Sequence, residues 1–201
     1  MSSQPAAQDR RIQRTRETLR AGLLELMKQK PFQQISVQEL TRACNLNRST
    51  FYLHYASVAE LLEEMEQEIL QGLCSVLDRF EQHDPCSPES VISADAAMIE
   101  AFQFLADYHD FFRTIVESHG NSGFVRRVMD IVRNRCLGIW ARSLCTSPSY
   151  LSDYFLTFIL SGCFGVVEQW ITTDMKQSPQ EIAQLVNRFI LTGASSFFNQ
   201  R

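Results

Sequence analysis

The chain has 201 residues, 45% of them hydrophobic, and a formal net charge of −4. That length and hydrophobic content can fill one large or two small buried cores. The sequence contains no run of about 18 apolar residues, which excludes a membrane-spanning helix, and its first residues lack the apolar centre of a secretion signal. We therefore expect a cytoplasmic protein that does not bind a membrane.

The N-terminal segment divides into a polar tail and a helix. Residues 1–9 are predicted to be a disordered tail, and apolar residues at helical spacing predict a helix over 10–29. The leucines of this helix form a stripe that we expect to face a core. Arg11 and Arg14 lie off this stripe, where a phosphate contact and a solvated surface position are equal alternatives.

The segment that follows reads as two short helices joined by a tight turn. Ser36 and Glu39 have the spacing of a capping box, in which the hydroxyl and the carboxylate each accept a backbone hydrogen bond at a helix start. Asn45 suits a left-handed residue that ends the first helix, and Asn47 can cap the second. The sequence thus predicts helices over 37–44 and 48–54, a pair that can place one helix in the major groove of DNA.

The rest of the chain is also predicted to be helical. Serine followed three residues later by glutamate marks helix starts at Ser57 and Ser178, and no convincing alternating strand pattern is present. We expect an all-α chain of about nine helices, with a head over 10–57 and a body over 58–201. The remaining predicted helices are 58–82, 88–107, 109–118, 122–144, 148–174 and 179–198.

The residues from Arg14 to Leu62 resemble the TetR family of bacterial transcriptional regulators. The most specific part of the resemblance is Asn47-Arg48-Ser49-Thr50-Phe51-Tyr52-Leu53-His54-Tyr55, which is similar to that family's recognition helix and its exit. The resemblance implies an N-terminal three-helix helix-turn-helix DNA-binding head. It also implies a larger helical bundle that binds a ligand and dimerises.

Candidate DNA contacts follow from residue chemistry and from the resemblance. Arg48 can donate two hydrogen bonds to one guanine, and Ser49 and Thr50 are small enough to approach base edges. The resemblance implies phosphate contacts by Tyr52 and His54 and a base or phosphate contact by Gln38, and Ser36 begins a helix whose N–H groups can face a phosphate. The candidate DNA-binding residues are Ser36, Gln38, Arg48, Ser49, Thr50, Tyr52 and His54.

Some positions of this helix remain open or depart from the family. Tyr52 could instead be a half-buried aromatic of the head core, whereas Phe51 is expected in that core. Leu53 could touch a thymine methyl group or simply pack. Val58 stands where many relatives carry a lysine, so one phosphate anchor is absent.

Charge separates the two ends of the chain. Residues 1–55 hold nine Lys and Arg against four Asp and Glu, a balance of +5, whereas residues 56–201 hold ten against nineteen, a balance of −9. A basic head on an acidic body suits phosphate neutralisation and counterion release. Beside the predicted helix-turn-helix, this reading is preferred over a chance solvated face, so we expect double-stranded DNA as a partner.

The last two predicted helices are apolar over most of their circumference, which predicts burial on several sides. A twofold four-helix interface between two copies would cover the side left over, and the resemblance implies the same homodimer on a near-palindromic operator. The expected interface residues are Phe158, Gly162, Val166, Trp170, Leu185, Phe189 and Gly193.

Aromatic residues also gather in the middle helices, where a plain hydrophobic core and an apolar ligand pocket are alternatives. Residue by residue the core is favoured, but the resemblance implies that such a body holds a small-molecule inducer. The candidate pocket residues are Phe102, Tyr108, His109, Phe112, Trp140, Cys163, Phe164 and Gln169.

No other chemistry stands out from the sequence. The six cysteines form no Cys-x-x-Cys pair and are expected to be reduced and structural, and the four histidines form no metal motif, so we predict no metal and no cofactor. An enzyme is disfavoured because no catalytic motif is present. We therefore predict a homodimeric repressor released by a small apolar or amphipathic ligand. The alternative is an adaptor or coactivator controlled by a protein partner, which would bind the acidic body and Arg126, Arg127, Arg133 and Arg135.

Overall fold

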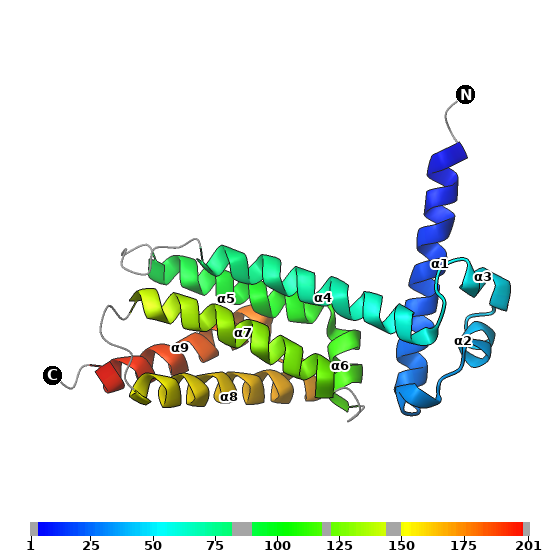
Figure 1. The fold of residues 1–201 in the computed structure, drawn as a ribbon. Helices are drawn as coiled ribbons and strands as arrows, with labels where there is room; N and C mark the ends of the chain where they lie inside the picture. The colour runs from blue at the N-terminus through cyan, green and yellow to red at the C-terminus, as the bar shows by residue number, and fades with distance from the viewer. Residues whose placement is uncertain (1–3, 82–89, 118–121, 144–149, 199–201) are drawn as a thin grey trace. The chain divides into compact units, whose positions relative to one another are not determined.

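The structure, a computed structural model, describes residues 4–81, 90–117, 122–143 and 150–198. Within these ranges the chain is all-α, as predicted, with nine α-helices, one short 3-10 helix and no strand. The helices are α1 (Gln4–Met27), η1 (Phe32–Gln34), α2 (Val37–Ala43), α3 (Arg48–Tyr52), α4 (Val58–Glu81), α5 (Ser90–Asp107), α6 (His109–Glu117), α7 (Ser122–Ser143), α8 (Tyr150–Thr172) and α9 (Pro179–Phe198) (Figure 1).

The predicted helix ends agree with the structure within two residues wherever they fall on described residues, except at the start of α1. This helix begins at Gln4 and not at residue 10, so the predicted disordered tail is wrong for residues 4–9. Pro5 is suited to a first helical turn because its φ is already fixed, and the two alanines that follow are the best helix formers. Those preferences outweigh the polar character of the segment.

The chain divides into two compact units, and α4 passes from one to the other after Ile69. The first unit contains Met1–Ile69 and Glu117–Asn121, which is more than the predicted head over 10–57, and the name head refers to this unit from here on. The second, called the body, contains Leu70–Val116 and Ser122–Arg201. Among the described residues, each helix is either too short or too polar to cross a bilayer.

The head is built on one small core. In it α2 packs against α1, and α3 against α2 (Figure 1). Gly22 permits the close approach of α1 and α2, because a Cβ atom at this position would lie 2.3 Å from the Cys44 sulfur. The side chains with no exposed surface come from all four helices: Leu19, Leu23, Leu40, Phe51 and Leu61.

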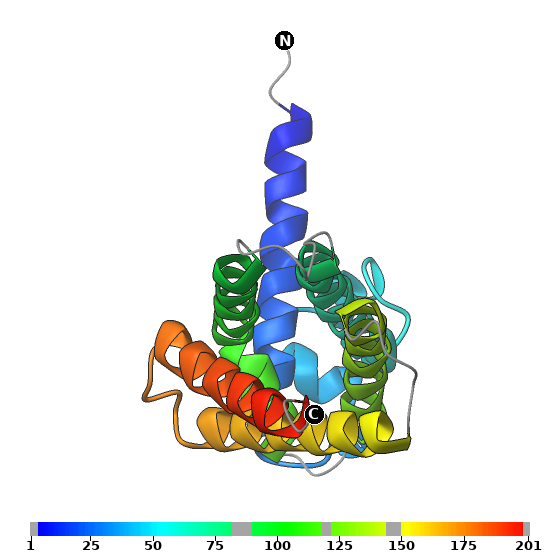
Figure 2. The same cartoon turned by 90° about the vertical axis from the view of Figure 1, so that its left-hand side faces the viewer.

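The body is a helical bundle in which α5 and α9 make the most extensive contact. Seen as in Figure 2, α5 and α7 are viewed nearly end-on, and α8 and α9 run obliquely to them. Gly72 of α4 sits against α5, since a Cβ atom there would lie 2.5 Å from the Phe104 ring. The main core combines three helices through Phe102, Trp170, Ile182, Ala183 and Val186.

Candidate nucleic-acid interface

The turn between α2 and α3 is fixed by backbone hydrogen bonds. Asn45 has a φ of 53°, which confirms the predicted left-handed residue. The Asn45 N–H donates to the Arg42 carbonyl at 3.1 Å, and the Leu46 N–H donates to the Thr41 carbonyl at 2.8 Å. These two bonds form a Schellman motif, which satisfies carbonyls at the end of α2 and sets the direction of the chain into α3.

The two helix starts of the motif differ from the sequence prediction. The Ser36 hydroxyl accepts from the Glu39 N–H at 3.3 Å, which is one half of the predicted capping box. The Glu39 carboxylate instead accepts from Lys30 Nζ at 2.5 Å, and this bond lowers the pKa of Glu39. Asn47 occupies the N-cap position of α3, but its side chain makes no capping hydrogen bond, contrary to prediction.

One face of α3 is anchored in the core of the head. Phe51 is fully buried, as predicted, and Tyr55, which follows the helix, is almost completely buried. Their rings lie 5.8 Å apart between centroids. Two buried aromatic side chains four residues apart fix the rotation of a short helix about its axis, so the opposite face of α3 is held toward solvent.

The opposite face carries most of the candidate DNA contacts. Arg48 and Ser49 are exposed, and the Tyr52 side chain is 58% exposed, which excludes the alternative of a half-buried core residue. Thr50 and His54 are half-buried. On α2, Gln38 is exposed close to the exposed cap Ser36. The structure therefore presents all seven candidates at least partly to solvent, on α3 with the residues just after it and at the start of α2.

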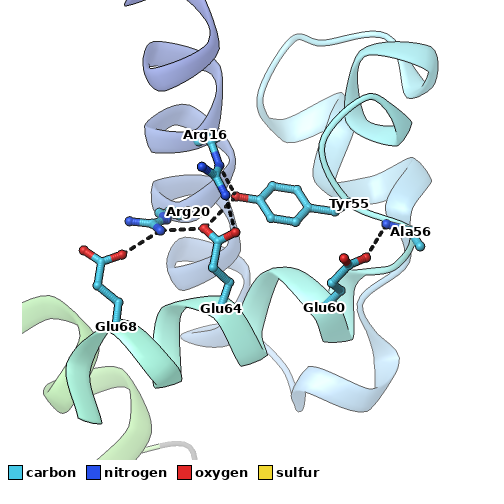
Figure 3. Close-up of polar contacts among 7 residues, drawn as sticks. All are labelled: Arg16, Arg20, Tyr55, Ala56, Glu60, Glu64 and Glu68. Atoms are coloured by element: carbon cyan, nitrogen blue, oxygen red, sulfur yellow. Dashed lines mark hydrogen bonds and ion pairs between the residues drawn. The ribbon is translucent and has the colours of Figure 1, made fainter. Parts of the chain in front are cut away.

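A cluster of charged side chains joins α1, α4 and the exit of α3 (Figure 3). Glu64 of α4 pairs with Arg16 and accepts from Arg20 Nη2 at 2.6 Å, and Arg20 also reaches Glu68 at 2.7 Å. The Tyr55 hydroxyl donates to Glu64 at 3.1 Å and accepts from Arg16 Nε at 3.0 Å. This network links Tyr55, which follows α3, to the two long helices α1 and α4.

The network shifts the ionisation of its own members. Burial would raise the pKa of Glu64, but the hydrogen bond from Arg20, the charge of Arg16 and the Tyr55 hydroxyl together lower it. This network was not predicted from the sequence. The four-residue spacing of Arg16 and Arg20, and of Glu64 and Glu68, was a signal for it, because each pair lies on one helix face.

The fourth helix also begins with a specific cap. The Ser57 hydroxyl accepts from the Glu60 N–H at 3.2 Å. The Glu60 carboxylate accepts from the Ala56 N–H at 2.5 Å (Figure 3). The predicted capping box is thus present, except that Glu60 accepts from the N–H of Ala56 and not from that of Ser57. These bonds fix the link between α3 and α4.

Comparison with known families identifies this arrangement. Residues 19–65 match the sequence model described as "Bacterial regulatory proteins, tetR family", and residues 93–192 match one described as "Transcriptional regulator C-terminal region". The chain belongs to the TetR family. It is a DNA-binding transcriptional regulator of the helix-turn-helix type, which confirms the resemblance found in the sequence.

Individual relatives support the TetR assignment over different lengths. The HTH-type transcriptional regulator YxbF of Bacillus subtilis (strain 168) is 43% identical over 60 residues, which are 29% of this chain and 16% of that protein. A TetR transcriptional regulator from Streptococcus agalactiae 2603V has a TM-score of 0.61 at 19% identity, with 92% of this chain and 98% of that chain covered. FadR from Bacillus halodurans, described as a fatty acid degradation regulator, has a TM-score of 0.60 at 13% identity, with 88% and 94% covered. The structural likenesses show the fold.

The body of this TetR regulator separates the predicted pocket residues into different groups. Phe102 belongs to the main core, with its ring 5.4 Å from that of Trp170, and Cys163 packs against the same core. Phe112 lies in a second cluster with Phe111 and Phe124. Within the described residues these groups are packed clusters, which favours the plain-core alternative for Phe102 and Phe112.

The other predicted pocket residues lie outside these clusters. The Tyr108 ring lies 4.9 Å from the Phe104 ring between centroids and is tilted by 46° to it. His109 is half-buried at the start of α6, beside Asp110. Phe164 is half-buried, and Gln169 is exposed, contrary to the expectation that it faces an interior. The Trp140 side chain lies outside the described residues. Burial raises the pKa of the Cys163 thiol, as it does for Cys44 in the head, which suits the predicted structural role of these cysteines.

The surface of α8 and α9 carries large exposed apolar side chains. Tyr154 is 75% exposed, Phe158 73% and Phe189 56%, and Leu185 is also exposed. A Cβ atom added at Gly162 or Gly165 would meet no atom within 4 Å, so both glycines face open space. Val166 and Gly193 are half-buried. On α8, the bulky side chains of Tyr154 and Phe158 thus lie on the same face as the open glycines Gly162 and Gly165.

Trp170 departs from the predicted interface set. It is 2% exposed, packs in the main core and donates from its ring N–H to the Gln177 carbonyl at 3.0 Å. The prediction that it meets a second copy is therefore corrected. Because α8 is apolar on nearly every side, its sequence pattern does not show which way a single aromatic side chain points. The turn after α8, with Asp174 and Met175 at positive φ, brings the Gln177 carbonyl to the ring N–H of Trp170.

Proposed function

We propose that this TetR-family regulator is a repressor that binds a near-palindromic operator as a homodimer and releases it when a small apolar or amphipathic ligand binds the body. The observation that carries the proposal is the orientation of α3. Phe51 and Tyr55 hold one face in the core, and Arg48, Ser49 and Tyr52 occupy the face that is exposed. A rigid short helix with an exposed polar face is suited to direct readout in the major groove.

Within this proposal the exposed residues have different roles. Arg48 reads a guanine through two hydrogen bonds, and Ser49 and Thr50 approach neighbouring base edges. Tyr52, His54, Gln38 and Ser36 contact phosphates or bases at the edges of the site and fix the register of the helix. The balance of +5 over residues 1–55 supports this assignment, because phosphate neutralisation by the basic side chains of this segment releases counterions.

The homodimer is proposed from the exposed face of α8 and α9. Tyr154 and Phe158 precede Gly162 and Gly165 on the same face of α8. When a second copy is related by a twofold axis and its α8 runs antiparallel, the aromatic side chains of each copy meet the open glycines of the other. A self-complementary surface of this kind gives a closed dimer, and burial of large aromatic side chains supplies the driving force.

The ligand class is proposed from relatives. FadR of Thermus thermophilus, described in a complex with lauroyl-CoA, has a TM-score of 0.52 at 16% identity, with 89% of this chain covered. We infer that an acyl chain is a suitable probe for the body of this regulator, which is rich in aromatic and aliphatic side chains. Ligand binding would favour a body conformation in which the two heads no longer match successive major grooves.

To test the proposal, the affinity of the purified regulator for the DNA upstream of its own gene is measured by fluorescence anisotropy at a series of salt concentrations. We expect sequence-selective binding that weakens steeply with salt. Arg48→Ala should cost about 1–3 kcal/mol and relax the preference at one base pair of each half-site. Arg126→Ala, an exposed arginine of the body, serves as the matched control and should bind like the wild type.

The switch is tested in the same assay. Lauroyl-CoA is the probe, and coenzyme A without the acyl chain is its control. Release of the operator by lauroyl-CoA alone supports the ligand proposal, whereas equal affinity with both compounds contradicts this ligand class. If the wild type and Arg48→Ala bind every fragment equally, α3 does not read bases and the regulator proposal fails.

A further inference from the structure

Leu53 is the most exposed large hydrophobic side chain among the described residues, at 80%. It is the C-cap of α3, and its backbone is still helical, with φ −72° and ψ −17°. Its N–H donates to the Ser49 carbonyl at 3.2 Å. The side chain therefore continues the exposed face of α3 one turn beyond Ser49.

The position of Leu53 gives its exposure a meaning that a scattered surface leucine does not have. Single exposed apolar side chains are ordinary on protein surfaces. Leu53, however, lies beside Tyr52 on the face directed away from Phe51 and Tyr55, which are buried. Leu53 follows Ser49 by four residues and lies on the same side of the helix, so a groove that receives Ser49 also receives Leu53, and this side chain then loses contact with water.

The chemistry of leucine limits what it can recognise in that groove. It has no hydrogen-bond donor or acceptor, so it cannot bind a phosphate or read the polar edge of a base. The apolar group that the major groove offers is the 5-methyl group of thymine. We propose that Leu53 contacts a thymine methyl group in each half-site of the operator and so determines part of the sequence specificity. This inference rests on the proposed function of α3 in base readout.

The experiment uses an operator that the full-length protein selects from a pool of random duplexes. Each thymine is then replaced, one at a time and in both half-sites, by deoxyuridine, which keeps the pairing and O4 but lacks the methyl group. We expect the wild type to lose about fourfold in affinity for each half-site at one thymine position, the value of burying one methyl-sized group. Leu53→Ala should bind the unmodified operator more weakly and lose this sensitivity at that position only.

The control variant is Ile12→Ala, which truncates an exposed apolar side chain of α1 and should keep the full deoxyuridine effect. Selective binding in which no thymine matters, or in which Leu53→Ala keeps the same sensitivity, overturns the inference and leaves the proposed function intact. If Leu53→Ala binds the unmodified operator like the wild type, Leu53 makes no contact with DNA and the inference also fails. Selection of no sequence at all overturns both proposals.

Discussion

The head and the body are stabilised by different kinds of interaction. In the head, specific hydrogen bonds and ion pairs fix how the helices follow one another: a Schellman motif after α2, serine caps on α2 and α4, and the network around Glu64. The body relies on the packing of long helices, with α5 on α9 and aromatic rings in two clusters. The exposed face of α3 is therefore oriented by polar bonds of fixed geometry together with the buried rings of Phe51 and Tyr55, whereas the body is held mainly by apolar packing.

The largest effect is expected when a large side chain is removed from the core of either unit. Phe51→Ala should cost about 3–5 kcal/mol, because it leaves a cavity in a small core. Phe102→Ala, its matched variant in the body core, should cost a similar amount. Thermal unfolding followed by circular dichroism and hydrogen exchange should place the loss in the head for the first variant and in the body for the second. Equal loss of protection throughout both units in either variant would show that the units unfold together.

The exposed face of the body offers the next largest effect. Phe158→Glu places a charge where the proposed dimer buries an aromatic ring, so we expect the dimer dissociation constant to rise by about a hundredfold. Sedimentation velocity over a concentration series measures it. Lys176→Glu, an exposed change in the turn after α8, is the control and should leave the dimer intact. A dimer of Phe158→Glu as tight as the wild type would place the interface elsewhere.

A smaller change separates the two kinds of proposed DNA contact, to phosphates and to bases. Tyr52→Phe removes only the hydroxyl of an exposed ring and should weaken binding by about 1 kcal/mol to every sequence equally, because a phosphate contact carries no base information. Competition binding with a set of operator variants checks this. A changed base preference would move Tyr52 from the phosphate-contacting group to the base-reading group.

An effect of similar size at pH 7, which fades as the pH falls, concerns the network at Glu64. The pKa of Glu64 is lowered below its ordinary value of 4.5 in the folded head, so its ionised form stabilises the fold above that pH and the contribution is lost as the pH falls through the lowered value. Glu64→Gln should cost about 1 kcal/mol at pH 7 and progressively less below pH 4.5.

Urea unfolding of wild type and Glu64→Gln at several pH values tests this dependence. Glu25→Gln, in an exposed pair with Lys28, should change stability little at any pH. A Glu64→Gln difference that stays constant down to low pH would show that the side chain acts by shape alone.

The sequence predicted the head well because its signals are local. Asn45 follows a short apolar helix and precedes another, so the left-handed turn was visible within ten residues. The contact between Arg16 and Glu64 joins residues 48 positions apart, and no local pattern specifies which arginine meets which carboxylate. Asn47 shows a further limit, because a favourable cap residue leaves its side chain out of the cap.

The body was predicted in outline but not in the direction of its side chains. Capping residues gave the start of α9, where Ser178 and Glu181 form the predicted reciprocal bonds at 2.8 Å and 3.2 Å. The sequence of α8 is apolar nearly all round, so periodicity could not tell the buried Trp170 from the exposed Phe158. For the same reason the aromatic residues of a packed core and of a ligand pocket look alike in sequence.

Base readout by α3 in a twofold dimer is tested most directly by letting the full-length protein select binding sites from random DNA duplexes, which are sequenced after several rounds. We expect an inverted repeat whose half-sites lie about one helical turn, or a multiple of it, apart and carry a guanine that Arg48→Ala no longer selects. Enrichment of a single unrepeated site would contradict the twofold dimer. No enrichment of any sequence would contradict base readout by α3.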